Sequence, residues 1–154
     1  MDISDLITPR SVIAQLRATS KRQALQELAK RAAAITGIPD RTIFDVLSER
    51  ERLGSTGIGM GIGIPHGRVP GLDKFYGIFA RLERPIAFEA IDDQPVDLLF
   101  LLLAPEIAGT EHLKALARVS RLLRDRAVCG KLRGTDNPDA LYALLTDMTE
   151  SDAA

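Results

Sequence analysis

The chain has 154 residues, 45% of them hydrophobic, and its 20 Lys and Arg nearly balance 21 Asp and Glu for a formal net charge of -1. This length suits one compact domain. The near-neutral net charge lacks the basic excess typical of nucleic-acid binders and of proteins that bind membrane surfaces. The longest apolar run, 98–104, is too short to cross a bilayer, the acidic N-terminus does not look like a secretory signal, and the single cysteine, Cys129, excludes an internal disulfide. We therefore expect a cytoplasmic domain with no membrane insertion and no nucleic-acid partner.

Hydrophobic periodicity, caps and turn residues give an order of strand, two helices, several strands and then further helices. The expected elements are a strand at 11–16, helices at 20–37 and 39–54, a glycine-rich stretch at 54–67, strands at 75–82 and 96–104 with another extended segment at 86–88, and helices at 110–124, 128–132 and from 137. This order predicts an α/β fold, a single three-layer domain whose central mixed β-sheet is flanked by helices. We expect that domain to span 1–154, with a frayed tail at 149–154.

Glycines alternate with apolar residues between positions 57 and 64. In one extended strand, the apolar set would share a buried face and the glycines would leave the other face bare. That apolar set is Ile58, Met60, Ile62 and Ile64. We therefore predict a strand whose glycine face something approaches closely. The spacing fits neither the dinucleotide-binding pattern nor the phosphate loop of nucleotide-binding proteins.

The chain contains only two histidines. Pro65 is expected to end strand pairing and Gly67 to leave space beside the ring, so His66 should stand at a strand end, facing solvent or a cleft. His112 falls in the first turn of a predicted helix, where the helix N-terminus favours anions and lowers the pKa of a histidine. Either residue could be an ordinary structural histidine, but together they could share an anion.

Two separated blocks resemble one protein family. The first is R-E-x-x-G-S-T-G-I-G-x-G-I-x-I-P-H-G from Arg50 to Gly67, and the second is H-L-K-A-L-A-R-V-S-R-L-L-R at 112–124. Both resemble the fructose/mannitol-type Enzyme IIA domains of the bacterial phosphotransferase system, and the Ser-Thr-Gly motif is most similar to the nitrogen-related branch. The resemblance covers the whole chain and implies that family's fold. Gly63 and Met60 depart from the usual alanine and from an often polar or acidic residue, which removes support for an acid-assisted role at position 60.

The resemblance implies a role for individual residues. His66 would be the phosphorylated nucleophile, His112 would hydrogen-bond the phosphoryl group or His66, and Arg50 would face the phosphate. Ser55 and Thr56 match a loop that donates hydroxyl or backbone hydrogen bonds to the phosphate. The bare glycine face would let a partner's phosphohistidine approach. No metal and no cofactor are implied.

The resemblance also implies partners. An HPr-like phosphocarrier protein would supply the phosphoryl group, and in the nitrogen-related branch the phosphorylation state regulates other proteins by binding. The outputs of that branch include potassium transport, nitrogen metabolism, envelope stress and sensor kinase systems. Two alternatives remain open: a sugar-specific Enzyme IIA that passes phosphate to a IIB subunit, and a binding module whose histidines are structural.

Overall fold

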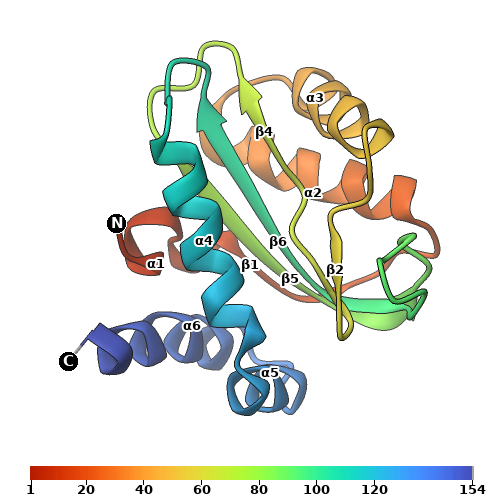
Figure 1. Ribbon diagram of the computed structural model, residues 1–154, viewed down its shortest axis with the longest axis vertical. Coiled ribbons are helices and arrows are strands. Elements are labelled where there is room, and N and C mark those ends of the chain that lie inside the picture. The colour runs from red at the N-terminus through yellow and green to blue at the C-terminus, as the bar shows by residue number, and fades with distance from the viewer. Residues whose placement is uncertain (154) are drawn as a thin grey trace.

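A mixed β-sheet runs through the middle of the molecule, with helices on both faces (Figure 1). The computed structural model describes the backbone of residues 1–153 and the side chains of residues 1–146. The described strands are β1 (Val12–Leu16), β2 (Gly57–Gly59), β3 (Ile62–Gly63), β4 (His66–Val69), β5 (Tyr76–Ile86) and β6 (Val96–Pro105). The helices are α1 (Ile3–Leu6), the 3-10 turn η1 (Pro9–Ser11), α2 (Lys21–Thr36), α3 (Asp40–Arg52), α4 (Glu111–Arg124), α5 (Arg126–Arg133) and α6 (Pro138–Ala153). The predicted fraying of 149–154 falls outside the residues whose side chains are described.

The strand order is β1-β5-β6-β3-β2, and β4 also pairs with β6. β5 runs antiparallel to β6, whereas β3 and β4 run parallel to it. Alternate residues of β6 enter two separate cores: Leu99 and Leu101 pack on one side, and Leu98 and Phe100 on the other. The burial of this strand on both faces, predicted from its continuous apolar sequence, is confirmed.

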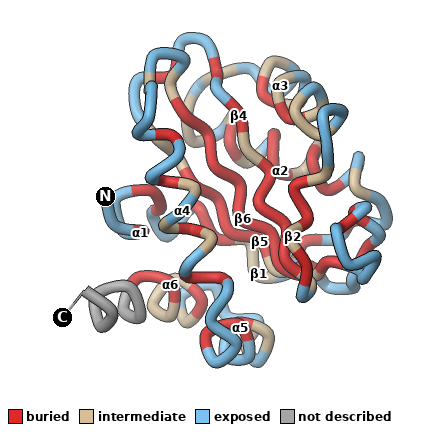
Figure 2. The backbone as a smooth tube through the Cα atoms, in the orientation of Figure 1, coloured by how far each residue is buried: buried red, intermediate tan, exposed pale blue. Residues whose placement is uncertain are grey.

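Two helical layers cover the two faces of the sheet. α2 and α3 bury Leu28 and Leu47 in the first core, whereas α4 and α5 bury Val119 and Leu132 in the second, together with α1 and α6. Figure 2 shows this division as buried strands between helices whose outer sides are exposed. The predicted single three-layer domain with a mixed sheet is confirmed.

The glycine-rich stretch is not the single strand that its alternation predicts. β2 and β3 form a short antiparallel pair, and the chain reverses between them at Met60 and Gly61, whose φ angles are 59° and 81°. The Asp92 carboxylate accepts a hydrogen bond from the Met60 N–H at 2.9 Å and holds this turn. Met60 is consequently 47% exposed, while Ile62 is buried as predicted. Glycine's tolerance of positive φ made the reversal available, which a count of alternating residues does not reveal.

The close approach predicted for the glycine face comes from the chain itself. A Cβ atom at Gly57 would lie 2.9 Å from Cα of Ala90, and one at Gly63 would lie 2.8 Å from Cδ2 of Leu99. The expectation that these glycines leave room for a partner's phosphohistidine is therefore wrong, because neighbouring segments of the same chain fill that space.

Pro65 does not end the pairing with β6. Its carbonyl accepts a hydrogen bond from the Leu102 N–H at 2.9 Å, and His66 pairs in register with Leu102 as β4 begins. A proline removes only its own donor, so the parallel pairing continues past it. His66 consequently stands at the start of a strand rather than in a turn after one.

Candidate functional site

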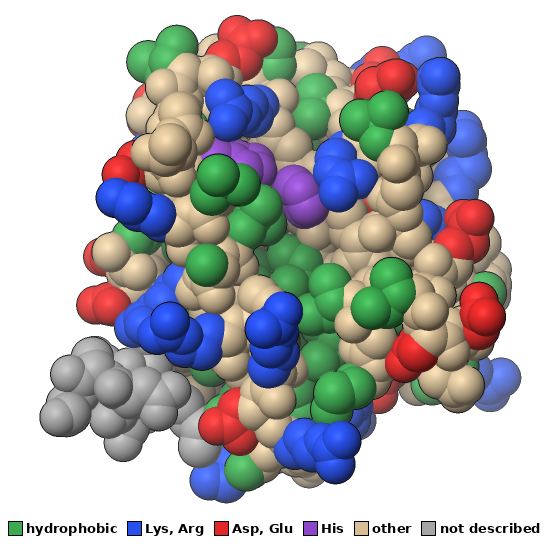
Figure 3. All heavy atoms as spheres, in the orientation of Figure 1, with side chains coloured by type: hydrophobic (Ala, Val, Ile, Leu, Met, Phe, Trp, Pro, Cys, Tyr) green, Lys and Arg blue, Asp and Glu red, His purple; other side chains and the backbone are tan. Residues whose placement is uncertain are grey.

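Three of the residues singled out from the sequence meet in one cleft. His66 begins β4, His112 lies in the first turn of α4, and Arg50 lies in the last turn of α3. The two imidazole centroids are 5.5 Å apart with the rings tilted by 59°, and the cleft has a volume of about 690 Å³. Figure 3 shows the two histidines side by side in a hollow, with basic side chains close by.

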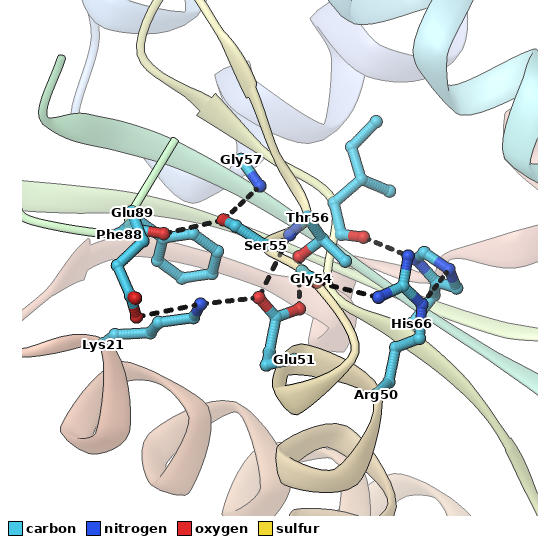
Figure 4. Close-up of polar contacts among 11 residues, drawn as sticks. Lys21, Arg50, Glu51, Gly54, Ser55, Thr56, Gly57, His66, Phe88 and Glu89 are labelled. Carbon is cyan, nitrogen blue, oxygen red and sulfur yellow. Dashed lines mark hydrogen bonds and ion pairs between the residues drawn. The ribbon is translucent and has the colours of Figure 1, made fainter. Parts of the chain in front are cut away.

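The backbone fixes the tautomer of His66. Its Nδ1 lies 2.8 Å from the carbonyl oxygen of Ile64, two residues earlier in the chain. A carbonyl oxygen only accepts hydrogen bonds, so Nδ1 carries the proton and Nε2 carries a lone pair. Nε2 is the nitrogen on the Arg50 side of the ring (Figure 4), and its lone pair gives it the chemical capacity to act as a nucleophile.

Arg50 is held at two points. Its Nη1 donates to the Gly54 carbonyl at 2.8 Å, and its Nε donates to Nε2 of His66 at 3.3 Å. The first contact links the end of α3 to the loop that follows it. The second places a permanent positive charge beside Nε2 of His66, where an anionic group bound to that nitrogen would be stabilised.

His112 is 7% exposed, and its Nδ1 is buried with no hydrogen-bond partner among the described residues. Burial lowers the pKa of His112, and the neighbouring His66 and Arg68 lower it further. Arg68 donates hydrogen bonds to the carbonyls of Glu106 and Gly109 at 3.3 and 3.2 Å, so it also holds the loop that leads into α4. The site thus keeps a neutral ring with an unsatisfied nitrogen next to His66.

The pKa of His66 is also lowered. Burial is the main cause and the Arg50 charge adds to it, while the Ile64 hydrogen bond and the Glu51 charge oppose them. A lowered pKa keeps the imidazole neutral at pH 7, which is the form whose Nε2 can attack an electrophile. A neutral His66 ring next to the Arg50 guanidinium is suited to binding an anionic group at Nε2.

The structure does not bring the side chains of Ser55 and Thr56 to either histidine. The Ser55 hydroxyl donates to the Phe88 carbonyl at 2.8 Å and accepts from the Gly57 N–H at 3.0 Å, and the Thr56 hydroxyl bonds to the Glu51 carboxylate. Figure 4 shows Ser55 directed toward Phe88, away from His66. Direct contact of these hydroxyls with phosphate stays a prediction, and the observed hydrogen bonds give both a role within the loop.

Gly67 acts on the site through helix packing. A Cβ atom at Gly67 would lie 2.4 Å from Cγ1 of Val46, so the glycine allows α3 to approach β4 closely. The space that the sequence assigned to the side of the imidazole is therefore occupied by α3. This approach is what brings Arg50, one turn further along α3, within reach of His66.

Sequence reasoning missed two supporting residues, Ile64 and Glu51. The Ile64 carbonyl carries no side-chain signal, whereas Glu51 stands beside Arg50 in the same sequence block and could have been found there. Among the side chains described, no group of three or more His, Cys, Asp or Glu is arranged to hold a metal ion. No helix within the described part of the chain has the length and apolar character needed to cross a membrane.

Residues 5–148 match the family model described as "Phosphoenolpyruvate-dependent sugar phosphotransferase system, EIIA 2". The chain belongs to this EIIA family. The match includes both histidines and the whole Arg50–Gly67 block, so the resemblance seen in the sequence is confirmed.

Relatives place this EIIA domain near the nitrogen-related branch. It is 55% identical over 145 residues to the "Nitrogen regulatory protein" of Bradyrhizobium diazoefficiens, covering 94% of this chain and 95% of the relative. Its fold matches that of "Nitrogen Regulatory Protein IIA-Ntr" from Neisseria meningitidis with a TM-score of 0.88 and 31% identity, covering 94% and 99% of the two chains. The mannitol IIA protein of Escherichia coli shares the fold at a TM-score of 0.76 and 20% identity, covering 90% and 98%.

Proposed function

We propose that this EIIA domain is a regulatory phosphoryl carrier of the cytoplasm. Nε2 of His66 would accept a phosphoryl group from the phosphohistidine of an HPr-like phosphocarrier protein, and the phosphorylation state would control binding to regulated proteins. The observation that carries the proposal is the geometry at His66: Nδ1 is bonded to the Ile64 carbonyl, and Nε2 is left as a nucleophile against Arg50.

The reaction needs one bond exchange. The Nε2 lone pair forms a new N–P bond while the N–P bond of the carrier breaks, and its electron pair returns to the carrier's ring. The Ile64 carbonyl keeps its hydrogen bond to Nδ1–H and stabilises the positive charge that the ring gains. Arg50 must then turn its donors from Nε2 to the oxygens of the incoming group.

Catalysis of this step is mainly alignment and charge stabilisation, because the transferred group carries negative charge on three oxygens. Arg50 supplies a fixed cation, and the His112 ring lines the same cleft, where a ring N–H would donate a hydrogen bond to the phosphoryl group. These two residues are therefore proposed to stabilise the transfer and the phosphorylated form.

Regulation is the favoured outcome because relatives covering nearly the whole chain are named nitrogen regulatory proteins. Potassium transport and sensor kinase systems are the target classes that we propose. The alternative is transfer to a separate IIB subunit of a sugar system.

The experiment is reconstitution with phosphoenolpyruvate, Enzyme I and the phosphocarrier, followed by intact-mass measurement. We expect one added phosphoryl group on the wild type and none on His66→Gln. Absence of the added group on the wild type would overturn the carrier function. Rapid loss of the label to an added IIB subunit would support the sugar pathway, whereas a stable label and capture of target proteins by one phosphorylation state only would support regulation.

A further inference from the structure

Arg50 and Glu51 are neighbours in the last turn of α3, yet they hold opposite sides of the loop at 53–57 (Figure 4). We propose that Glu51, clamped by Lys21, is a positioning residue for phosphoryl transfer. It fixes the loop so that the Gly54 carbonyl can hold the Arg50 guanidinium against His66. This inference rests on the proposed function, because it concerns the alignment of the proposed phosphate-stabilising arginine.

The Glu51 carboxylate binds the loop with both oxygens. Oε1 accepts from the Thr56 N–H at 3.1 Å, and Oε2 accepts from the Thr56 hydroxyl. The Glu51 side chain is only 6% exposed. A carboxylate so nearly removed from water is stable only when its oxygens are paired, so its contacts with Thr56 define one loop conformation.

Lys21, the first residue of α2, supplies the countercharge. Its Nζ lies 2.8 Å from Oε1 of Glu51 and 4.7 Å from the centroid of the Phe88 ring, and its side chain is 15% exposed. Lys21 therefore ties the start of α2 to the end of α3 and to the segment after β5. Because that segment also accepts the Ser55 hydroxyl through the Phe88 carbonyl, the loop is fixed on two sides.

The loop then passes this constraint to Arg50. Gly54 lies between the end of α3 and the start of β2. It adopts a φ of 149°, and its carbonyl accepts a hydrogen bond from Nη1 of Arg50 at 2.8 Å. The guanidinium is thus described with two hydrogen bonds, one to the Gly54 carbonyl and one to Nε2 of His66. An arginine side chain has several freely rotating bonds, so losing the carbonyl would release it into many orientations in the cleft. The path from Glu51 to Nε2 of His66 thus runs through Thr56, Gly54 and Arg50.

A positioning role and a merely structural role make different predictions for a double-mutant cycle. If Glu51 acts through Arg50, then replacing Glu51 should slow phosphoryl transfer only when Arg50 is present. If Glu51 only stabilises the loop, its effect on the rate should be small, or should multiply with the effect of removing Arg50.

The experiment measures the initial rate of phosphorylation by the phosphorylated carrier, as kcat and KM, for Glu51→Gln, Arg50→Ala and the double variant. We expect a roughly tenfold fall in kcat for Glu51→Gln with little change in KM, and no further fall when Glu51→Gln is added to Arg50→Ala. Glu27→Gln is the matched control, because it removes a carboxylate from an ion pair with Lys30 on the outer face of α2 and should leave the rate unchanged.

A second variant keeps the test informative if Glu51→Gln fails to fold. Thr56→Val preserves the charge of Glu51 and removes the hydroxyl, so it should also slow transfer, and Thr56→Ser should restore the rate. In Thr56→Val the pKa of His66, followed by NMR, should rise, and we expect the same rise in Arg50→Ala, because in both variants Arg50 would no longer lower that pKa. A loop that is loosened without displacing Arg50 would leave that pKa unchanged.

Three results would overturn the inference while leaving the proposed function standing: wild-type kcat in Glu51→Gln, rate losses that multiply in the double variant, or an unchanged His66 pKa in Thr56→Val. Failure of the wild type itself to accept phosphate is a different outcome. It would remove the proposed function and the inference with it.

Discussion

Replacing Arg50 with alanine removes the cation beside the nucleophilic nitrogen while leaving its tautomer intact. The Ile64 carbonyl continues to hold Nδ1–H, so Nε2 remains a neutral nucleophile. The variant loses the hydrogen bonds that the guanidinium donates to the Gly54 carbonyl and to Nε2 of His66. Arg50 is only half-buried, so the fold should survive its removal.

The expected size follows from the donor's position. Loss of one preorganised donor to a developing anion slows enzymes about 10² to 10³-fold, and the open cleft puts this site at the lower end. We expect a fall of roughly 100-fold, or about 2.7 kcal/mol of transition-state stabilisation. Arg50→Lys keeps the charge but cannot hold the Gly54 carbonyl and the phosphoryl group together, so it should lose about tenfold.

The assay is rapid-quench transfer from the phosphorylated carrier, read by intact mass. Arg52→Ala is the matched control, because Arg52 lies in the same helix turn, is exposed and pairs with Glu49 rather than with a histidine. Wild-type rates in Arg50→Ala would refute the charge-stabilisation argument. Equal losses in Arg50→Ala and Arg52→Ala would show that general surface charge, rather than the guanidinium at His66, governs transfer.

Three further predictions concern packing, the second histidine and pH. Gly67→Ala should lower the free energy of unfolding by about 1–3 kcal/mol, because its Cβ would overlap Val46, and Val46→Ala should recover part of that loss in denaturant titrations. His112→Ala should slow transfer about tenfold with an unchanged circular dichroism spectrum, and a wild-type rate would remove its role. Since both histidine pKa values are lowered by folding, the unfolded state binds more protons just below pH 6.5, so stability should fall as the pH drops from about 6.5 toward the folded-state pKa values. A double His→Gln variant at 66 and 112 should lose this dependence, and an unchanged fall in that variant would assign it to other groups.

The fold was largely predictable because its signals are local and strong. Ser20 accepts the Gln23 N–H and Gly37 adopts a left-handed φ of 79°, so both ends of α2 follow from single residues. The β2–β3 reversal at Met60 was not predictable from alternation, because Asp92 stabilises it from 32 positions away. Short strands joined by a glycine turn and one extended strand have the same periodicity.

The site was predictable to the extent that its chemistry lies in side chains. Arg50, His66 and His112 do meet in the structure, and the family resemblance had placed them together. The hydrogen-bond assignments of Ser55 and Thr56 were not predictable, because they depend on which carbonyl or carboxylate lies nearest after folding. The tautomer of His66 depends on a hydrogen bond to the backbone carbonyl of Ile64, and the identity of a residue does not predict where its carbonyl points.

The most direct test of the central claim is an NMR spectrum of the ¹⁵N-histidine-labelled protein after phosphorylation by the carrier. Our account predicts a phosphoryl group on Nε2 of His66, with Nδ1 still protonated and hydrogen-bonded. Phosphate on Nδ1 of His66, phosphate on His112, or no phosphohistidine at all would contradict it.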